Sequence, residues 1–287
     1  MLSLVGLVLL FGIVFGGYIL EGGDLAPIIH AAPGETFIIA GAALSAMVIA
    51  NSMTIVKGVF SGFLHILSGA KFKKQDYLDV IFLVSKLMKV LKSEGAVALE
   101  SHVENPESSA IFGEYPRLLK DHALVHLITD SIRLLVISSP APRPDTMEDV
   151  MNLSIKTHHH EALKPAEAYA SLAGALPALG IVACVLGVVK TMGSIDQPPA
   201  VLGGLIGSAL VGTFLGVLLA YGVAEPLGVR LKQIIDEEGQ IYHVAKQIII
   251  GTLNGYPIPV VIEAARVGIT HECQPSFSEV FDGLRGK

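Results

Sequence analysis

The residues whose types could support chemistry lie in two uncharged apolar stretches, 168–189 and 197–224. Pro177 lies in the first stretch, and a proline within a helix removes one hydrogen bond and clashes with the carbonyl four residues earlier. Thr213 lies in the second, where its hydroxyl could line a hydrated path for an ion, although a hydrogen bond to its own helix is the commoner use. The sequence therefore predicts a kink or hinge at Pro177 and marks Thr213 as a candidate lining residue of an ion path.

Other chemistries have little support. No phosphate-binding loop, nucleophile elbow, paired-cysteine motif or HExxH motif occurs in the sequence. His158, His159 and His160 are adjacent, but neighbouring residues on a helix point about 100° apart and do not converge on a metal, so we interpret them as a solvated face. Cys184 and Cys273 cannot build a disulfide framework and fit a reducing compartment. The sequence thus predicts neither an enzyme nor a cofactor or metal site.

Acidic side chains and histidines are missing from all four apolar stretches of the chain. The stretches 2–20, 36–56, 168–189 and 197–224 contain no carboxylate and no histidine. Ionisable residues at membrane depth mark proton relays and ion sites. If the protein helps to move an ion, another chain must therefore supply the titrating group. The pattern predicts a channel or transporter subunit that is incomplete alone.

Small residues recur at helical spacing in both uncharged stretches. Positions four apart share a face of a helix. Lipid gives helices no hydrophobic reason to associate, so small faces allow backbones to pack closely. The spacing fits tight helix packing, the commoner case, and it also fits a wall around an ion path or a partner helix. The second stretch carries Gly204, Ser208, Gly212 and Gly216, and the first carries Pro177, Gly180, Cys184, Gly187 and Thr191.

Composition indicates an integral membrane protein with an all-α fold. The mean hydropathy is +0.61, with 52% apolar and 16% charged residues. A helix needs about 20 apolar residues to cross a bilayer core of about 30 Å. The first apolar stretch lacks a basic start and a cleavage site, so we expect a retained span there. We predict an N-terminal transmembrane hairpin over 1–56, with spans at about 2–20 and about 36–56, and a second hairpin over 167–227, with spans at about 168–189 and about 199–225.

The remainder of the chain is predicted to be helical and cytoplasmic. Lys and Arg number 20, of which 13 lie within 57–164 and six within 230–287, whereas the connection 21–35 carries three acidic residues and no basic one. Basic residues favour the cytoplasmic side of a membrane. We therefore expect a cytoplasmic helical loop domain over 57–166, a cytoplasmic helical tail over 228–287, and both termini inside the cell.

Capping and turn residues predict individual helices in these two regions. Asp76 fits an N-cap, and Pro116 fits a first helical turn. Asn254, Gly255 and Pro257 indicate a helix end. The expected helices run from Asp76 to Ser93, from Pro116 to about Ser138, from Thr146 towards the second hairpin, and over 227–253.

Three segments resemble one known family, the MotA family of flagellar motor stator subunits. Ala175–Leu227 closely resembles its third and fourth spans, Leu99–Leu119 resembles its characteristic loop segment, and Asn254–Arg266 resembles a segment of its tail. The likeness follows nearly the whole chain in order. It implies a four-span protein that surrounds two copies of single-span MotB in a five-to-two complex. MotB would then bring the membrane aspartate that this chain lacks.

The resemblance also implies roles for individual residues. The two functional prolines of the family fall on Pro177 and Pro226. Its charged pair that faces the rotor protein FliG falls on Lys92 and Glu100, with Glu104 as a further rotor contact. The basic member of that pair is normally an arginine. Lys92 keeps the charge but lacks the planar fork that pairs bidentately with a carboxylate.

The transported ion is also implied by the resemblance. Thr213 matches a threonine that proton-driven and sodium-driven members share, whereas Cys184 stands where sodium-driven relatives place a second threonine. A thiol is a poor ligand for a hard cation that prefers oxygen. We therefore expect Cys184 and Thr213 to line the path of protons.

The function expected from this resemblance is that of a stator subunit in the bacterial inner membrane. With MotB, it would form a proton channel that converts proton-motive force into torque. The nearest alternative is the related ExbB and TolQ group, which energises outer-membrane processes, but those proteins have three spans and lack the N-terminal hairpin. A self-sufficient transporter and a structural scaffold are more distant alternatives. The net charge of −6 and the absence of a basic stripe argue against nucleic acid, so the expected partners are MotB, FliG, further copies of the chain and lipid.

Overall fold

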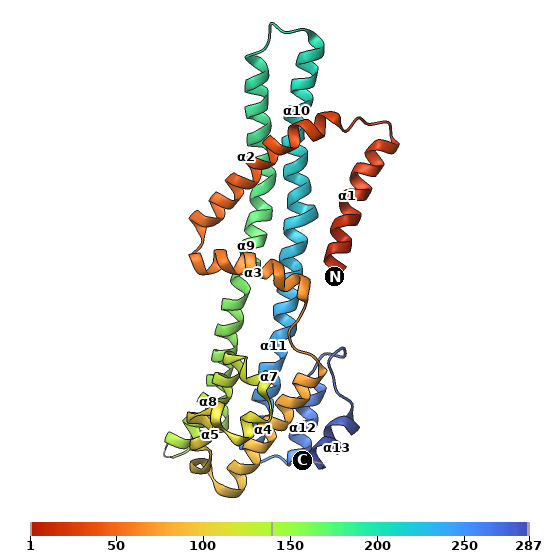
Figure 1. Cartoon of the computed structure of the whole chain (residues 1–287). Helices are drawn as coiled ribbons and strands as arrows, with labels where there is room; N and C mark the ends of the chain where they lie inside the picture. The colour runs from red at the N-terminus through yellow and green to blue at the C-terminus, as the bar shows by residue number, and fades with distance from the viewer. Residues whose placement is uncertain (1, 139, 286–287) are drawn as a thin grey trace. The chain divides into compact units, whose positions relative to one another are not determined.

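The computed structural model describes residues 2–138 and 140–285, and every regular element in these residues is helical (Figure 1). Four helical stretches are long and apolar enough to cross a membrane. The predicted fold class, an all-α protein with four such helices, is therefore confirmed. The four stretches are α1 (Leu2–Leu20), α2 (Ala26–Ala50), α9 (Pro144–Met192), and the continuous run of α10 (Pro199–Val217), a π-helix (Leu218–Ala224) and α11 (Glu225–Leu253).

The chain divides into two compact units. The first contains the chain up to Gly69 together with Leu163–Ile234, and the second contains Ala70–Ala162 together with the chain from Ile235 onwards. The first crossing between the units follows the end of α3 (Met53–Ser68), whereas the other two lie inside α9 and α11, which each supply residues to both units. The predicted domain limits at 57–166 and 228–287 stay predictions.

In the first unit, α2 packs against α9 and α10 through an apolar cluster. Ile39 is fully buried, and Ala43 is nearly so. Their partners come from α9 and from α10 with its π-helical continuation. These partners are Ala173, Leu176, Ala183, Val211, Leu215, Ala220 and Ala224.

Helix α2 differs from the predicted second span. A charged residue usually marks the edge of a span, and the sequence therefore predicts a start after Glu35. The helix instead begins at Ala26, with a proline in its first turn, and ends at Ala50, so the predicted range of about 36–56 crosses a helix break at Asn51 and Ser52. The four apolar stretches contain no carboxylate and no histidine, but α2 begins ahead of its predicted stretch and therefore also carries His30 and Glu35.

Helix α3 (Met53–Ser68) follows that break with one buried face. Val56, Val59 and Ile66 are buried, and the hydroxyl of Tyr169 on α9 donates a hydrogen bond of 3.0 Å to the Val59 carbonyl. The opposite face exposes apolar residues, including Leu64 at 67%. With 16 residues, α3 is shorter than the roughly 20 residues that a helix needs to cross a bilayer, so it is not counted among the spanning helices.

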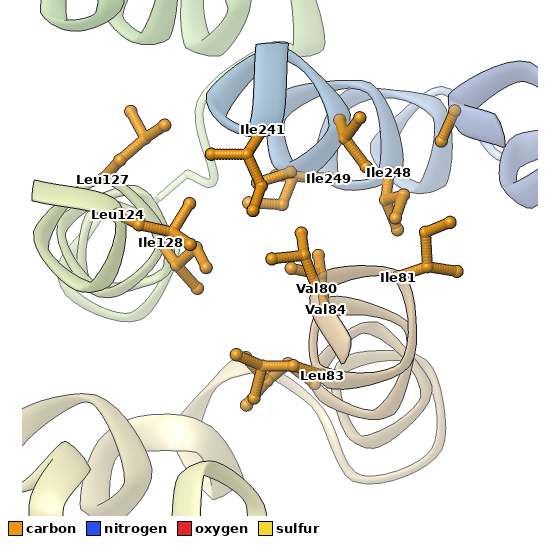
Figure 2. Packing of buried hydrophobic residues seen from close by; sticks show 14 of the residues in the cluster. Val80, Ile81, Leu83, Val84, Leu124, Leu127, Ile128, Ile241, Ile248 and Ile249 are labelled. Atoms are coloured by element: carbon orange, nitrogen blue, oxygen red, sulfur yellow. The ribbon is translucent and has the colours of Figure 1, made fainter. Parts of the chain in front are cut away.

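The second unit is built around one apolar core between three helices. These are α4 (Lys74–Glu94), α8 (His122–Ile137) and the C-terminal part of α11. Their side chains point towards one another (Figure 2). The labelled residues are Val80, Ile81, Leu83 and Val84 of α4, Leu124, Leu127 and Ile128 of α8, and Ile241, Ile248 and Ile249 of α11.

Short helices complete the second unit. Between α4 and α8 lie a 3₁₀ turn (Ala96–Leu99), α5 (Glu100–Glu104), a second 3₁₀ turn (Pro106–Ser108), α6 (Ala110–Gly113) and α7 (Pro116–Leu119). After α11 come α12 (Ile258–Val267) and α13 (Phe277–Arg285). The predicted stop after 227–253 is confirmed, because α11 ends at Leu253 and Gly255 adopts a positive φ of 77°.

Two carboxylates of the second unit cap helices in ways the sequence does not predict. Asp76 is the third residue of α4 and not its N-cap, and it accepts a hydrogen bond of 2.8 Å from the Lys73 backbone N–H. The predicted helix from Pro116 to Ser138 is broken by Asp121, which caps α8 by accepting a 2.8 Å hydrogen bond from the Leu124 N–H. Asp121 also lies 2.5 Å from Lys71 Nζ. Asp121 therefore satisfies one free backbone donor at the start of α8, and α8 begins as a helix separate from α7.

Truncating Ile128 tests this core. Its side chain is fully buried between α4 and α11, so Ile128→Ala should leave a cavity and lower the free energy of unfolding by about 2–5 kcal/mol. Val97→Ala is the control, because Val97 is 73% exposed. Resistance to proteolysis at increasing temperature, measured on the detergent-solubilised protein, should fall for the first variant only. Equal proteolysis curves for both variants would contradict the placement of Ile128 in the core.

Candidate ion-pathway site

Helices α9 and α10 touch through their backbones. A Cβ atom added to Gly216 would lie 2.8 Å from the Gly180 Cα and 2.8 Å from the Leu176 carbonyl oxygen. A Cβ added to Gly180 would lie 2.8 Å from the Gly212 carbonyl oxygen. Real Cβ atoms do not approach backbone so closely, so only glycine fits at these positions.

The predicted small face of α10 does not act as one surface within the chain. Gly212 and Gly216 lie in the contact with α9, whereas Ser208 lines a cavity beside α2. A Cβ on Gly204 would meet nothing within 4 Å in the described chain. The face of α9 continues the contact, because a Cβ on Gly187 would lie 2.6 Å from the Ala209 Cβ.

The two residues expected along the ion path lie near the same contact. A Cβ on Gly212 would be 3.2 Å from the Cys184 backbone nitrogen, and a Cβ on Gly180 would be 3.4 Å from the Thr213 Cα. Cys184 and Thr213 are both half-buried. The structure therefore brings them to the same part of the α9–α10 hairpin, and their role in ion passage stays a prediction.

The two expected functional prolines lie in different helical surroundings. Pro177 is inside α9, which continues through it without a break, so a hinge there stays a prediction. Pro226 is the second residue of α11 and directly follows the π-helix. The Glu225 N–H bonds to the Ala220 carbonyl, five residues earlier. This wider turn moves the carbonyls that precede Pro226, which lets the helix continue through a residue that cannot donate.

Sequence reasoning missed a cavity beside this contact that carries a few polar side chains in a mostly apolar lining. It has a volume of about 420 Å³ and lies between α2, α9 and α10. Its polar lining comes from His30 and Glu35 of α2, Lys190 of α9 and Ser208 of α10. The only sequence signal was the presence of two ionisable residues in the connection between the first two predicted spans. That signal has meaning only once α2 is known to start at Ala26.

The residues expected to face the rotor are exposed in the second unit. Lys92 lies near the end of α4, with its Nζ 3.4 Å from the Tyr256 carbonyl oxygen, and Glu100 begins α5. Glu104 ends α5 and accepts a 2.7 Å hydrogen bond from Arg133 Nε. That hydrogen bond raises the pKa of the Arg133 guanidinium. The negative charge of Glu104 is therefore paired with the positive charge of Arg133. Lys92 and Glu100 have no such ion pair within the described residues.

Comparison with known proteins supports the same interpretation along the whole chain. Residues 4–95 match the family model described as motility protein A N-terminal. Residues 120–243 match the model described as the MotA/TolQ/ExbB proton channel family. The chain is 38% identical over 285 residues to motility protein A of Escherichia coli, covering 99% of this chain and 95% of that protein. It is 30% identical over 280 residues to the chemotaxis protein LafT of Vibrio parahaemolyticus, covering 98% and 97%.

Two solved structures share the fold. The structure of C. jejuni MotAB superposes with a TM-score of 0.73 at 19% identity, covering 96% of this chain and 98% of that one. The flagellar MotAB stator complex from Bacillus subtilis gives a TM-score of 0.67 at 21% identity, covering 99% and 98%. At these identities the structural likeness supports the fold alone.

The four spanning helices and the glycine-packed α9–α10 hairpin define a membrane channel protein of the MotA/TolQ/ExbB class, which is not a class of enzymes. Within that class, the chain belongs to the motility protein A family, the proton channel proteins of the flagellar motor stator. The family expected from the sequence resemblance is confirmed.

Replacing Gly216 by alanine tests the contact between α9 and α10. The added methyl group would overlap backbone atoms, and overpacking of this kind costs about 1–3 kcal/mol. We expect Gly216→Ala to lower the melting temperature of the detergent-solubilised protein. Gly174→Ala of α9 is the control, and it should be neutral or slightly stabilising, because its Cβ position is open and alanine favours a helix. Equal destabilisation by both changes would contradict this packing.

Proposed function

We propose that the chain, together with MotB subunits, forms a proton channel that converts proton-motive force into torque on the flagellar rotor. The observation that carries the proposal is the 38% identity to Escherichia coli motility protein A over 99% of this chain. Two solved structures with the same fold, from C. jejuni and Bacillus subtilis, are MotAB structures. The match of residues 4–95 to the motility protein A N-terminal model favours this function over the ExbB and TolQ alternative.

The proposed assembly is a ring of five copies around two MotB chains. The supporting feature is apolar surface that a single chain leaves uncovered. No residue of α1 is buried, and Val185 of α9 is 55% exposed. Gly203, Gly204 and Gly207 of α10 have open space around them in the described chain. Neighbouring copies, MotB helices and lipid would cover these surfaces.

The proposed coupling runs through the two prolines. Protonation of the MotB aspartate, which we place against the α9–α10 hairpin, would change the packing of helices near Pro177 and Pro226. The π-helix before Pro226 supports this proposal, because π-helical turns are frequent at functional sites and can change their hydrogen bonding locally. Cys184 and Thr213 would line the path.

The proposed rotor contact is the exposed surface that carries Lys92 and Glu100, with Glu104 beside it. Its partner would be FliG. Lys92 and Glu100 offer charges of opposite sign to solvent, which suits electrostatic recognition of a charged partner surface. The membrane would be the bacterial inner membrane, with both termini in the cytoplasm, because the basic residues of the second unit favour that side.

Complementation of a deletion strain tests the function. Wild-type protein should restore swimming, whereas Pro177→Ala should give paralysed cells, because alanine keeps the helix but removes the proline ring and restores the backbone N–H donor that proline lacks. Membrane insertion is checked by blotting and flagella are counted by microscopy. Paralysis with normal insertion and normal flagella supports the proposal. Unimpaired swimming of the deletion strain itself would argue against it, or reveal a second stator.

The identity of the ion has its own test. Because Cys184 offers sulfur where a sodium site needs oxygen, we expect rotation speed to follow the proton-motive force and to be insensitive to sodium. Tethered cells are observed while sodium is exchanged for potassium at constant proton-motive force. Rotation that requires sodium would refute proton transport.

A further inference from the structure

Glu35 is a carboxylate inside a spanning helix that the expected mechanism does not use. Its Oε2 atom is buried and has no hydrogen-bond partner among the described residues. A carboxylate oxygen removed from water without a donor is costly, and ionisable groups in spanning helices are usually functional. The packing around α2 therefore makes the charged form of Glu35 costly at this one oxygen, although the residue as a whole is only half-buried.

The position of Glu35 Oε2 depends on the absence of a side chain at Gly212. A Cβ on Gly212 would lie 2.6 Å from Glu35 Oε2, so alanine at 212 and the carboxylate could not both stay in place. The same Cβ position is 3.2 Å from the Cys184 backbone nitrogen. Glu35 thus reaches the α9–α10 contact at the level of the expected ion path, and it does so through the gap that Gly212 leaves.

The cavity beside Glu35 is large enough to hold water. Its volume of about 420 Å³ exceeds by several-fold the roughly 30 Å³ that one water molecule occupies in the liquid. The charged or titratable residues that line it are His30 on the same helix and Lys190 on α9, and α10 contributes only the Ser208 hydroxyl as a polar group. Lys190 lies near the end of α9 that leads into the α9–α10 connection. Under the proposed orientation, that end faces the cell exterior.

We infer that Glu35 is a proton-relay group, fed by water in this cavity, that passes protons to the path along α9 and α10. Oε2 accepts a proton from a hydronium ion and leaves water, and the resulting carboxylic acid gives the same proton to the next acceptor and returns to carboxylate. Protonation also neutralises a carboxylate whose Oε2 atom accepts no hydrogen bond from the described residues. The inference rests on the proposed function, in which the next acceptor is the MotB aspartate.

Isosteric substitution of Glu35 separates a relay from a packing role. Glu35→Gln keeps the shape but cannot carry a proton, and Glu35→Asp keeps the chemistry in a shorter side chain. Loss of a general acid–base group slows proton transfer by about 10²-fold or more, so we expect Glu35→Gln to stop or strongly slow rotation of tethered cells, and Glu35→Asp to retain measurable speed. Glu21→Gln is the matched control, because Glu21 is exposed in the turn between α1 and α2.

Assembly is measured in the same cells, as membrane protein on a blot and as fluorescent stator foci at motors. Normal foci with slow rotation for Glu35→Gln, and a speed that no longer responds to external pH, support the relay. Wild-type speed of Glu35→Gln at every external pH would overturn it. Loss of foci for both Glu35 variants would also overturn it, and would assign Glu35 to contacts between chains. Failure of the wild-type protein to restore rotation would instead count against the proposed function.

Discussion

Direct contact between the backbones of α9 and α10 is the constraint on which the spanning part of this protein depends. Gly180 and Gly216 approach so closely that neither can carry a Cβ atom, and Gly187 extends the contact to Ala209. In lipid, helices gain no hydrophobic free energy by pairing, so this van der Waals fit supplies much of what holds the hairpin together. It also fixes where the third helix, α2, can pack.

The absence of side chains on the glycines of this contact also determines where α2 can place a carboxylate. Gly212 is buried between three helices, and the space that it leaves is taken by the carboxylate of Glu35. The glycine that allows close helix packing therefore also allows a titratable group to lie beside Cys184. Packing and chemistry in this hairpin cannot be changed independently, because one glycine serves both.

The sequence predicts those features that follow from local composition. Uncharged length indicates the spanning helices, and the four-residue spacing of glycines indicates which faces are small. Prediction from the sequence fails where a tertiary contact outweighs a local sequence signal. Glu35 looks like the edge of a span, yet α2 begins at Ala26, and the carboxylate lies beside a cavity between α2, α9 and α10. Asp121 looks like an interior helical residue, yet Lys71 and the free N–H groups of α8 make it a cap.

The π-helix that precedes Pro226 has a mechanical consequence. A π-helical turn holds one residue more than an α-helical turn, so Leu218–Ala224 stores a surplus residue within a continuous helix. If that turn took up α-helical hydrogen bonding, the residues after it would turn by about 100° and advance by about 1.5 Å along the axis. In such a step, the helix rotates about its axis and advances along it at the same time. The chain thus contains, in one segment of its fourth spanning helix, a way to turn a local change of hydrogen bonding into rotation without unfolding.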